Sequence, residues 1–276
     1  MVSAVDVESE CVRLGRQDGR NAALKLVRYL AAGGPLFGTI RGADVYRLDG
    51  NPFGAHDIGS LVGPLKSVIL LPPCVPTKII ATGLNYRDPT QEGLSAVPDE
   101  PIISFKPPSS LIGPGEAIIW PRISTRIDFE GEMAVVIGRD ARNVSPSEAI
   151  DYIYGITCGN DVTARDVQRR EGQWAKAKGF DTFCPLGPCI VTGLDLANCQ
   201  LTTRINGETR QSASTRLLHF NACDLVSYIS QIMTLVPGDI ILTGTPAGSA
   251  PLKIGDVVEV EIEGVGTLRN TVRKTD

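Results

Sequence analysis

The sequence has little histidine and none of the short motifs that mark the large nucleotide-dependent enzyme classes. Its 276 residues contain only His56 and His219, which are too few and too isolated to suggest a histidine-based metal cluster. It has no Gly-x-Gly-x-x-Gly segment, no Gly-x-x-x-x-Gly-Lys-Ser/Thr loop and no Gly-x-Ser-x-Gly elbow. Nothing in the sequence therefore indicates a dinucleotide-binding fold, a phosphate-binding loop or a hydrolase of the nucleophile-elbow type.

A membrane-spanning run and a basic surface are also missing. The chain has no unbroken apolar stretch of about 18 residues, and Met1–Glu10 carries acidic side chains without the apolar centre of a signal peptide. Lys and Arg number 27 against 31 Asp and Glu, a net charge of −4, whereas a nucleic-acid-binding face usually needs a basic excess. We therefore expect neither a membrane nor a nucleic-acid partner.

The seven cysteines form no recognisable metal or disulfide pattern. Their number is odd, no Cys-x-x-Cys is present, and the spacing of Cys184 and Cys189 is not that of a zinc knuckle. Without a signal peptide, such a chain is expected to be cytoplasmic and reduced, with its cysteines used for packing.

Composition divides the chain into three parts. Residues 1–23 have the character of a polar leader, with a helix over Ser9–Arg20, and residues 24–75 that of a small N-terminal β domain. A proline-rich stretch over residues 72–76 separates this domain from a larger one over residues 76–276. The strands expected in the small domain are Leu24–Tyr29, Leu36–Ile40 and Val45–Leu48.

The larger domain is expected to contain short strands and few helices. Ser145–Glu148 has the form of a capping box and predicts a helix through Tyr154. Asn206-Gly207 predicts a two-residue hairpin, and Asn221 is expected to cap a helix over Ala222–Thr234. The fold class is therefore α+β and β-rich. The predicted strands are Lys78–Gly83, Ile102–Phe105, Ala117–Trp120, Met133–Gly138, Asp239–Thr243 and Val257–Ile262.

Two glutamates stand at the start of a strongly apolar segment. On an extended backbone Glu130 and Glu132 point to the same face, about 6.6 Å apart along the strand. Like charges this close are destabilising unless a cation or water separates them. Because Met133–Ile137 has apolar side chains on both faces of the strand, the strand is expected to enter a core. The alternative is an exposed strand end with two solvated carboxylates.

A second acidic segment follows the apolar stretch Ile153–Cys158. Asp161 lies there among amides and an arginine, and a turn with a surface ion pair is the alternative. Three carboxylates without an imidazole or thiolate suit a hard cation, Mg²⁺, Mn²⁺ or Ca²⁺, before Zn²⁺. Such a site leaves coordination positions for water and a chelating substrate.

Basic and hydroxyl side chains in other loops complement these acids. Lys106 and Lys178 lie in proline- or glycine-rich loops next to aromatic residues, where an amine can be aimed at an anion. Thr245 follows a predicted strand and offers a hydroxyl group to a carboxylate. Each segment alone is more often structural than functional, and their co-occurrence is what indicates a site.

Six segments of the larger domain form one set: Gly83–Asp88, Phe105–Pro108, Asp128–Glu132, Asn160–Asp166, Lys178–Pro188 and Thr243–Gly248. Together they resemble the fumarylacetoacetate hydrolase family, in its order and spacing, over residues 78–273. The resemblance implies a mixed β-roll of the family's C-terminal type, preceded by a small N-terminal β domain, and a homodimer.

The resemblance also implies roles for individual residues. It makes Glu130, Glu132 and Asp161 the ligands of Mg²⁺ or Mn²⁺, with Ca²⁺ as a further option. The remaining residues are expected to bind or act on a small 2-oxo acid. They are Glu92 and Lys178 as catalytic groups, and Arg165, Gln168, Lys106, Thr245 and Asp88 as substrate-binding groups.

The sequence departs from the family immediately after Asp88. Many hydrolytic and decarboxylating members have a histidine there and a glutamate three residues later, a pair that activates water on a lid. This chain has Pro89 and Glu92 at those positions. A proline cannot transfer a proton, so a general base typically worth about 10²–10⁴ in rate is lost, while enolate stabilisation is retained.

The sequence therefore predicts a divalent-metal-dependent enzyme that acts on a 2-oxo or 2-hydroxydienoic acid or diacid through an enolate. C–C bond hydrolysis, decarboxylation and keto–enol isomerisation all remain open, and the last two require least from a base. A catalytically impaired family member that binds metal and ligand is the alternative from another class. A specialised enzyme of secondary metabolism with a rebuilt lid is a third.

Overall fold

The computed structural model describes residues 23–87 and 98–275. The predicted helix Ser9–Arg20 and the predicted site residues Asp88 and Glu92 lie outside the described residues. Among the described ones, no helix is both long enough and apolar enough to cross a membrane.

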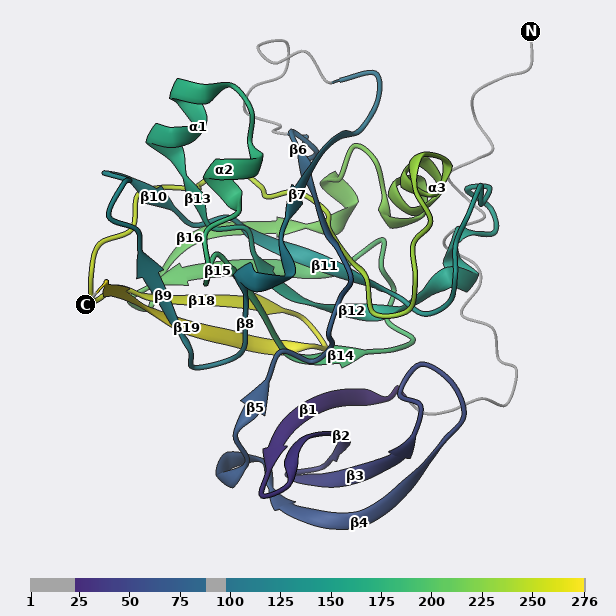
Figure 1. The fold of residues 1–276 in the computed structure, drawn as a ribbon. Helices are drawn as coiled ribbons and strands as arrows, with labels where there is room; N and C mark the ends of the chain where they lie inside the picture. Colours follow the sequence, from purple (N-terminus) through teal and green to yellow (C-terminus); the bar gives the residue numbers. More distant parts are fainter. Residues whose placement is uncertain (1–22, 88–97, 276) are drawn as a thin grey trace, which may run out of the picture.

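Strands near the start of the described chain form a meander at one end of the molecule (Figure 1, purple and blue). They are β1 (Lys25–Ala31), β2 (Gly34–Arg41), β3 (Asp44–Gly50), β4 (His56–Pro64) and β5 (Leu70–Leu71). The three strands predicted here are confirmed, and β4 and β5 are additional to them. In β4, Gly59 and Gly63 interrupt the alternation of apolar and polar residues, so the sequence pattern of a strand is weak there.

Backbone pairing joins this meander to the rest of the chain. Leu26 in β1 pairs with Ile190 in β14, and the strand order is β4-β3-β2-β1-β14-β12-β11-β17-β6-β7. One large sheet thus spans both predicted domains. β11 lies between β12 and β17, and every residue of β11 is buried. The remaining strands of this sheet are β6 (Ile79–Gly83), β7 (Ile102–Lys106), β8 (Leu111–Ile112), β11 (Gly131–Ile137), β12 (Ile153–Asn160), β14 (Cys184–Val191) and β17 (Ile240–Leu242).

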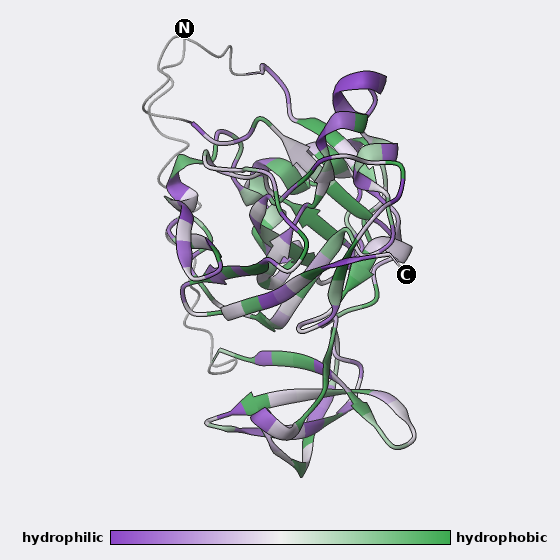
Figure 2. Ribbon diagram, turned by 90° about the vertical axis from the view of Figure 1, so that its left-hand side faces the viewer, coloured by the Kyte–Doolittle hydropathy of each residue, from purple (hydrophilic) through white to green (hydrophobic). Residues whose placement is uncertain are grey.

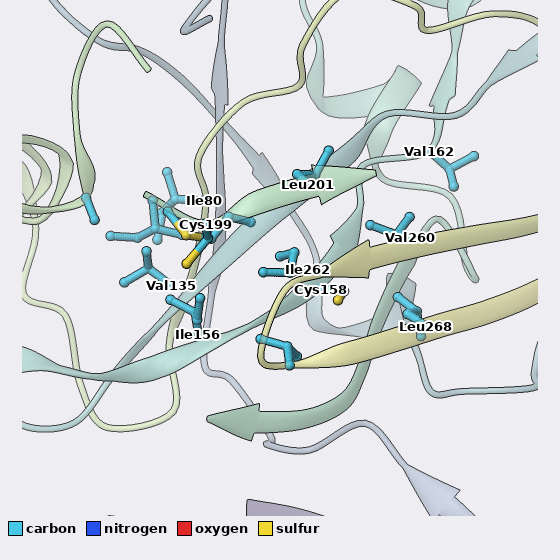
Figure 3. Close-up of a cluster of buried hydrophobic side chains, with 14 of the residues drawn as sticks. Ile80, Val135, Ile156, Cys158, Val162, Cys199, Leu201, Val260, Ile262 and Leu268 are labelled. Atoms are coloured by element: carbon cyan, nitrogen blue, oxygen red, sulfur yellow. The ribbon is translucent and has the colours of Figure 1, made fainter. Parts of the chain in front are cut away.

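A second sheet, in the order β16-β15-β18-β19-β9, packs against the large one. Figure 3 shows the core between them, where Val135 and Ile156 of the large sheet lie with Leu201 and Val260 of the second. Asn206-Gly207, both with positive φ, form the predicted hairpin between β15 and β16. The strands are β9 (Ala117–Trp120), β15 (Gln200–Ile205), β16 (Glu208–Ser214), β18 (Val257–Ile262) and β19 (Gly266–Lys274), with β10 (Ile127–Asp128) and β13 (Thr163–Ala164) forming a separate pair.

In the part of the chain that the structure describes, helices are few and short. The Asn221 side chain accepts hydrogen bonds from the N–H groups of Cys223 and Asp224, so the predicted cap at the start of α3 is confirmed. The α-helices are α1 (Arg165–Glu171), α2 (Ala175–Lys178) and α3 (Ala222–Ile232), and the 3₁₀ turns are η1 (Leu65–Ser67), η2 (Pro108–Ser110), η3 (Ala149–Tyr152) and η4 (Thr215–Leu217).

The helix predicted over Ser145–Tyr154 is wrong. Only Ala149–Tyr152 form a 3₁₀ turn, and β12 begins at the next residue, Ile153. The hydroxyl of Ser145 donates to the Glu148 carboxylate at 2.6 Å instead of capping a backbone amide. β12 pairs with β11 on one side and β14 on the other, so tertiary pairing of an apolar segment overrides the local helix signal.

The distribution of hydropathy agrees with this architecture. Hydrophobic residues follow the strands in the interior of the larger part (Figure 2, green). The six described cysteines are buried free thiols, as expected for packing residues, and Cys11 lies outside the described residues. The β-rich α+β fold class is confirmed.

Candidate metal centre and pocket

Antiparallel pairing of β11 with β12 brings the two acidic segments together. Gly131 pairs with Asn160, so Glu130, just before β11, lies opposite Asp161, just after β12. The N–H of Asp161 donates to the Glu130 carbonyl at 2.8 Å, and the N–H of Glu130 donates to Asn160 Oδ1 at 3.0 Å. Carboxylate oxygens of Glu130, Glu132 and Asp161 all lie within 4.8 Å of one another. Strand register therefore produces the acidic cluster.

All three carboxylates are buried. The exposed fraction is 8% for Glu130 and 1% for both Glu132 and Asp161. The interpretations as a solvated strand end and a surface turn are therefore wrong. Buried carboxylates in such proximity need positive charge beside them, because desolvation and mutual repulsion both disfavour the ionised forms.

Two buried lysines supply part of that charge. Lys106, at the end of β7, donates from Nζ to Asp161 Oδ1 at 2.6 Å and to the Val162 carbonyl at 3.1 Å. Lys178, at the end of α2, donates to Glu130 Oε2 at 3.0 Å and forms a second ion pair with Asp161. Asp161 is thus held between two ammonium groups.

Arg165 at the start of α1 adds a third cation. Its guanidinium forms an ion pair with Glu130 and donates to Asp128 Oδ2 at 3.0 Å. It also donates to Gln168 Oε1, one turn along α1, at 2.6 Å. The two predicted substrate-binding residues of α1 therefore contact each other beside the carboxylates.

These contacts shift the pKa values in opposite directions. Burial, together with the charges of Asp161 and Glu130, raises the pKa of Glu132. Burial would also raise the pKa of Asp161, but the ammonium groups of Lys106 and Lys178 outweigh it and lower that pKa. Burial alone would lower the pKa of Lys178, yet Asp161 and Glu130 raise it, so this amine remains a cation.

The donor set fits a hard divalent cation. Its three members offer only carboxylate oxygens, and two of them already converge on the positive charge of Lys178. The acidic cluster, together with Asp128 and the basic side chains around it, contains four carboxylates and four cations, so their charges cancel. A bound divalent ion would therefore leave excess positive charge for an anionic ligand. The carboxylates are Asp128, Glu130, Glu132 and Asp161, and the cations are Lys106, Arg126, Arg165 and Lys178.

A pocket of about 500 Å³ opens over the cluster. Leu84, Trp174 and Pro246 give it an apolar wall. The predicted site residues that line it are Glu130, Glu132, Arg165, Gln168, Lys178 and Thr245.

One predicted residue is placed differently, and two others lie outside the described residues. Lys106 lies behind Asp161 and is not among the described residues that line the pocket, so its position differs from the predicted substrate-binding one. Asp88 and Glu92, together with Pro89, lie outside the described residues.

Gln211 on β16 is a buried residue of the site that sequence reasoning missed. Its amide nitrogen donates to Thr245 Oγ1 and to the Pro246 carbonyl, both at 2.8 Å. Its amide oxygen accepts from the N–H of Gly131 at 3.1 Å. The only sequence signal is a polar residue at an inward position of a strand.

Gly244 positions the remaining glutamate. Its N–H donates to Glu132 Oε2 at 2.6 Å. The residue has φ of +101°, and a Cβ there would come within 2.9 Å of the Asn85 Cβ, so the loop after β17 requires glycine. The predicted Thr243–Gly248 segment thus contacts the acidic cluster through its backbone.

Comparison with known proteins identifies the family. The model described as fumarylacetoacetate (FAA) hydrolase C-terminal matches residues 78–273, and the one described as Rv2993c-like, N-terminal matches residues 24–73. The chain therefore belongs to the fumarylacetoacetate hydrolase family, which confirms the resemblance.

Relatives and solved structures carry isomerase and tautomerase names. Oxaloacetate tautomerase Fahd2a of Rattus norvegicus is 45% identical over 221 residues, covering 76% of this chain and 71% of that protein. The 2-hydroxyhepta-2,4-diene-1,7-dioate isomerase of Mycobacterium marinum has a TM-score of 0.85 and 42% identity, covering 91% of this chain and 99% of the other. The 5-carboxymethyl-2-hydroxymuconate delta-isomerase of Mycobacterium smegmatis has a TM-score of 0.84 and 43% identity, covering 91% and 100%.

Proposed function

We propose that this protein is a divalent-metal-dependent isomerase that interconverts the keto and enol forms of a 2-oxo acid. Oxaloacetate is the first substrate to test, because a relative of 45% identity is named as its tautomerase. The isomerase names of two solved structures at 42% and 43% identity support the same reaction type.

The observation that carries the proposal is the buried cluster of Glu130, Glu132 and Asp161 below a pocket lined by further cations. These three residues would hold Mg²⁺ or Mn²⁺. Such an ion supplies Lewis acidity that polarises a carbonyl group. Lys178 and Arg165, already aimed at Glu130, are positioned to bind carboxylate and carbonyl oxygens beside it.

The proposed isomerisation moves one proton and no other atom. The C3–H bond breaks, its electron pair forms the C2=C3 double bond, and the C2 carbonyl oxygen becomes an enolate oxygen that takes up a proton. The ammonium of Lys178, which lies beside Glu130 and Asp161, would stabilise the developing negative charge. We propose Glu92, on the family resemblance, as the group that exchanges the C3 proton.

Pro89 favours isomerisation over hydrolysis. Cleavage of a C–C bond by water needs a base that activates the water, and the family's usual histidine is replaced here by proline. Keto–enol exchange needs only a carboxylate beside an activated C–H bond. Decarboxylation also requires no base. Its product from oxaloacetate, pyruvate, distinguishes it from isomerisation.

The test is to follow the enol form of oxaloacetate with the full chain, in Mg²⁺, Mn²⁺ or EDTA, while measuring pyruvate and acylpyruvate cleavage in parallel. We expect metal-dependent ketonisation without pyruvate, and a loss of about 100-fold or more in Glu132→Gln because a ligand charge is removed. Glu208→Gln, on an exposed hairpin end, is the control.

Other outcomes reject the proposal. Pyruvate as the main product would make the protein a decarboxylase. Metal-dependent binding without any turnover would make it an impaired binding member. Unchanged activity of Glu132→Gln would reject the ligand assignment.

A further inference from the structure

We propose that Arg169 binds the carboxylate of the substrate that lies farther from the metal, and so selects 2-oxo diacids over 2-oxo monoacids. This inference rests on the proposed function, since it names a second anion site in the same pocket.

The placement of Arg169 follows from the helix period. Arg165, Gln168 and Arg169 stand at positions i, i+3 and i+4 of α1, so they share one face, and all three line the pocket. Arg165 and Gln168 are bound to each other at 2.6 Å beside Glu130. Arg169 lies one helical turn along α1 from Arg165, about 5.4 Å by the helix pitch, so its backbone is farther along the helix than that of the residue bound to Glu130.

Among residues 23–87 and 98–275, Arg169 differs from the other charged groups of this helix in having no partner. Arg165 pairs with Asp128 and Glu130. Arg170 pairs with Glu171 at 3.3 Å on the outer surface. Across the described residues, no hydrogen bond or ion pair involves the Arg169 side chain. Its charge is therefore free to meet an anionic ligand.

The surroundings strengthen such a contact. An exposed arginine at an open surface gains little from one carboxylate, because water screens the pair. Arg169 is itself exposed. It lines the same pocket as Leu84 and Trp174, so a ligand bound there would displace water from around the guanidinium and reduce that screening. Its planar guanidinium matches a carboxylate with two parallel hydrogen bonds.

Charge balance supports a dianionic ligand. The charges of the four carboxylates and four cations in and around the acidic cluster cancel without counting Arg169. A divalent ion and Arg169 together then leave an excess of positive charge, which a substrate with two carboxylates neutralises better than one with a single carboxylate. The chain joining the two carboxylates would lie along the apolar wall.

The experiment compares oxaloacetate with its 4-ethyl ester, which keeps the 2-oxo carboxylate but lacks the second charge. Turnover and calorimetric binding are measured in Mn²⁺ for the wild type, Arg169→Gln, Arg169→Lys and the matched control Arg170→Gln. We expect Arg169→Gln to raise KM and Kd for oxaloacetate about 10-fold with kcat changed less than about 2-fold. The ester should be affected less than about 2-fold, Arg169→Lys should recover part of the loss, and Arg170→Gln should match the wild type.

Equal effects of Arg169→Gln on both ligands, or no effect on either, would overturn the role of Arg169. The same loss in Arg170→Gln would also overturn it, because general surface charge would then explain the result. The wild type could bind oxaloacetate more tightly than the ester, and Arg169→Gln could lose this preference, while neither protein shows turnover. That result would uphold the anion site and reject the isomerase. A wild type that binds neither ligand rejects both.

Discussion

Gln211 accepts a hydrogen bond from the backbone N–H of Gly131 at 3.1 Å. Gly131 is the residue between Glu130 and Glu132, so this bond fixes the backbone from which both carboxylates project. The amide nitrogen of Gln211 donates to Thr245 Oγ1 and to the Pro246 carbonyl, both in the pocket wall. One buried side chain from the second sheet therefore bonds both the backbone of the acidic cluster and the Thr245–Pro246 part of the pocket wall.

Replacing Gln211 by leucine should weaken both the fold and the metal site. The N–H of Gly131 would lose its buried partner, at a cost of about 1–3 kcal/mol in the free energy of unfolding. Titration with Mn²⁺ should show weaker binding, since Glu130 and Glu132 lose a fixed spacing. Gln200→Leu, whose amide bonds Ser212 near the surface, is the control. Normal Mn²⁺ affinity in a folded Gln211→Leu would contradict this role.

Gly131→Ala should be among the most damaging small substitutions. A Cβ at this position would overlap Thr203 Oγ1 and approach Gln211 Oε1 to 3.1 Å. Overpacking of this kind costs about 1–3 kcal/mol in urea denaturation. Gly33→Ala, where nothing lies within 4 Å of the added carbon, should cost less.

Thr203→Ala provides the matching double-variant test. Thr203 Oγ1 is buried without a hydrogen-bonding partner among the described residues, so its removal alone should cost little. Combined with Gly131→Ala it should recover about 1 kcal/mol, because the overlap is relieved. Strict additivity of the two changes would show that the strain lies elsewhere.

Lys106→Met should destabilise the metal-free protein strongly. Both partners of the Lys106–Asp161 pair are about 1% exposed. Removal of Lys106 leaves Asp161 with Lys178 alone and the buried carboxylates in excess by one charge, at a cost of about 3–5 kcal/mol. Added Mn²⁺ should then raise the unfolding free energy of the variant more than that of the wild type, because the ion replaces the lost charge. The surface pair Lys176–Glu171 offers the control Lys176→Met, with little change expected. A variant as stable as the wild type in EDTA would refute this account of Asp161.

Asp166 should contribute a pH-dependent part of stability. Partial burial opposes its ionisation, but hydrogen bonds from Ser124 and Thr125 outweigh this and lower its pKa to about 2. Its stabilisation is therefore present above the unfolded pKa of about 4 and is lost as the pH falls through about 2. Contact with water reduces the effect to about 1 kcal/mol.

Asp166→Asn should remove that dependence. The variant should unfold more easily than the wild type at pH 7, and the difference should shrink between about pH 4 and 2. Asp57→Asn, at an exposed position of β4, serves as the comparison. A constant difference across this pH range would show that the carboxylate charge is not responsible.

The sequence predicted the chemistry of the site better than its packing. Glu130, Glu132 and Asp161 are visible as acids beside apolar segments, and strand register explains why they converge. The role of Gln211 depends on the approach of the second sheet, which no local pattern encodes. The failed helix at Ser145 has a similar cause, since pairing of β12 on both sides decides that segment.

The most direct test of the central claim is anomalous diffraction from crystals soaked in Mn²⁺. We expect one strong anomalous peak within bonding distance of oxygens from Glu130, Glu132 and Asp161, and no such peak in Glu132→Gln. A wild-type crystal without a peak there, with Lys178 still bridging Glu130 and Asp161 at saturating Mn²⁺, would contradict it.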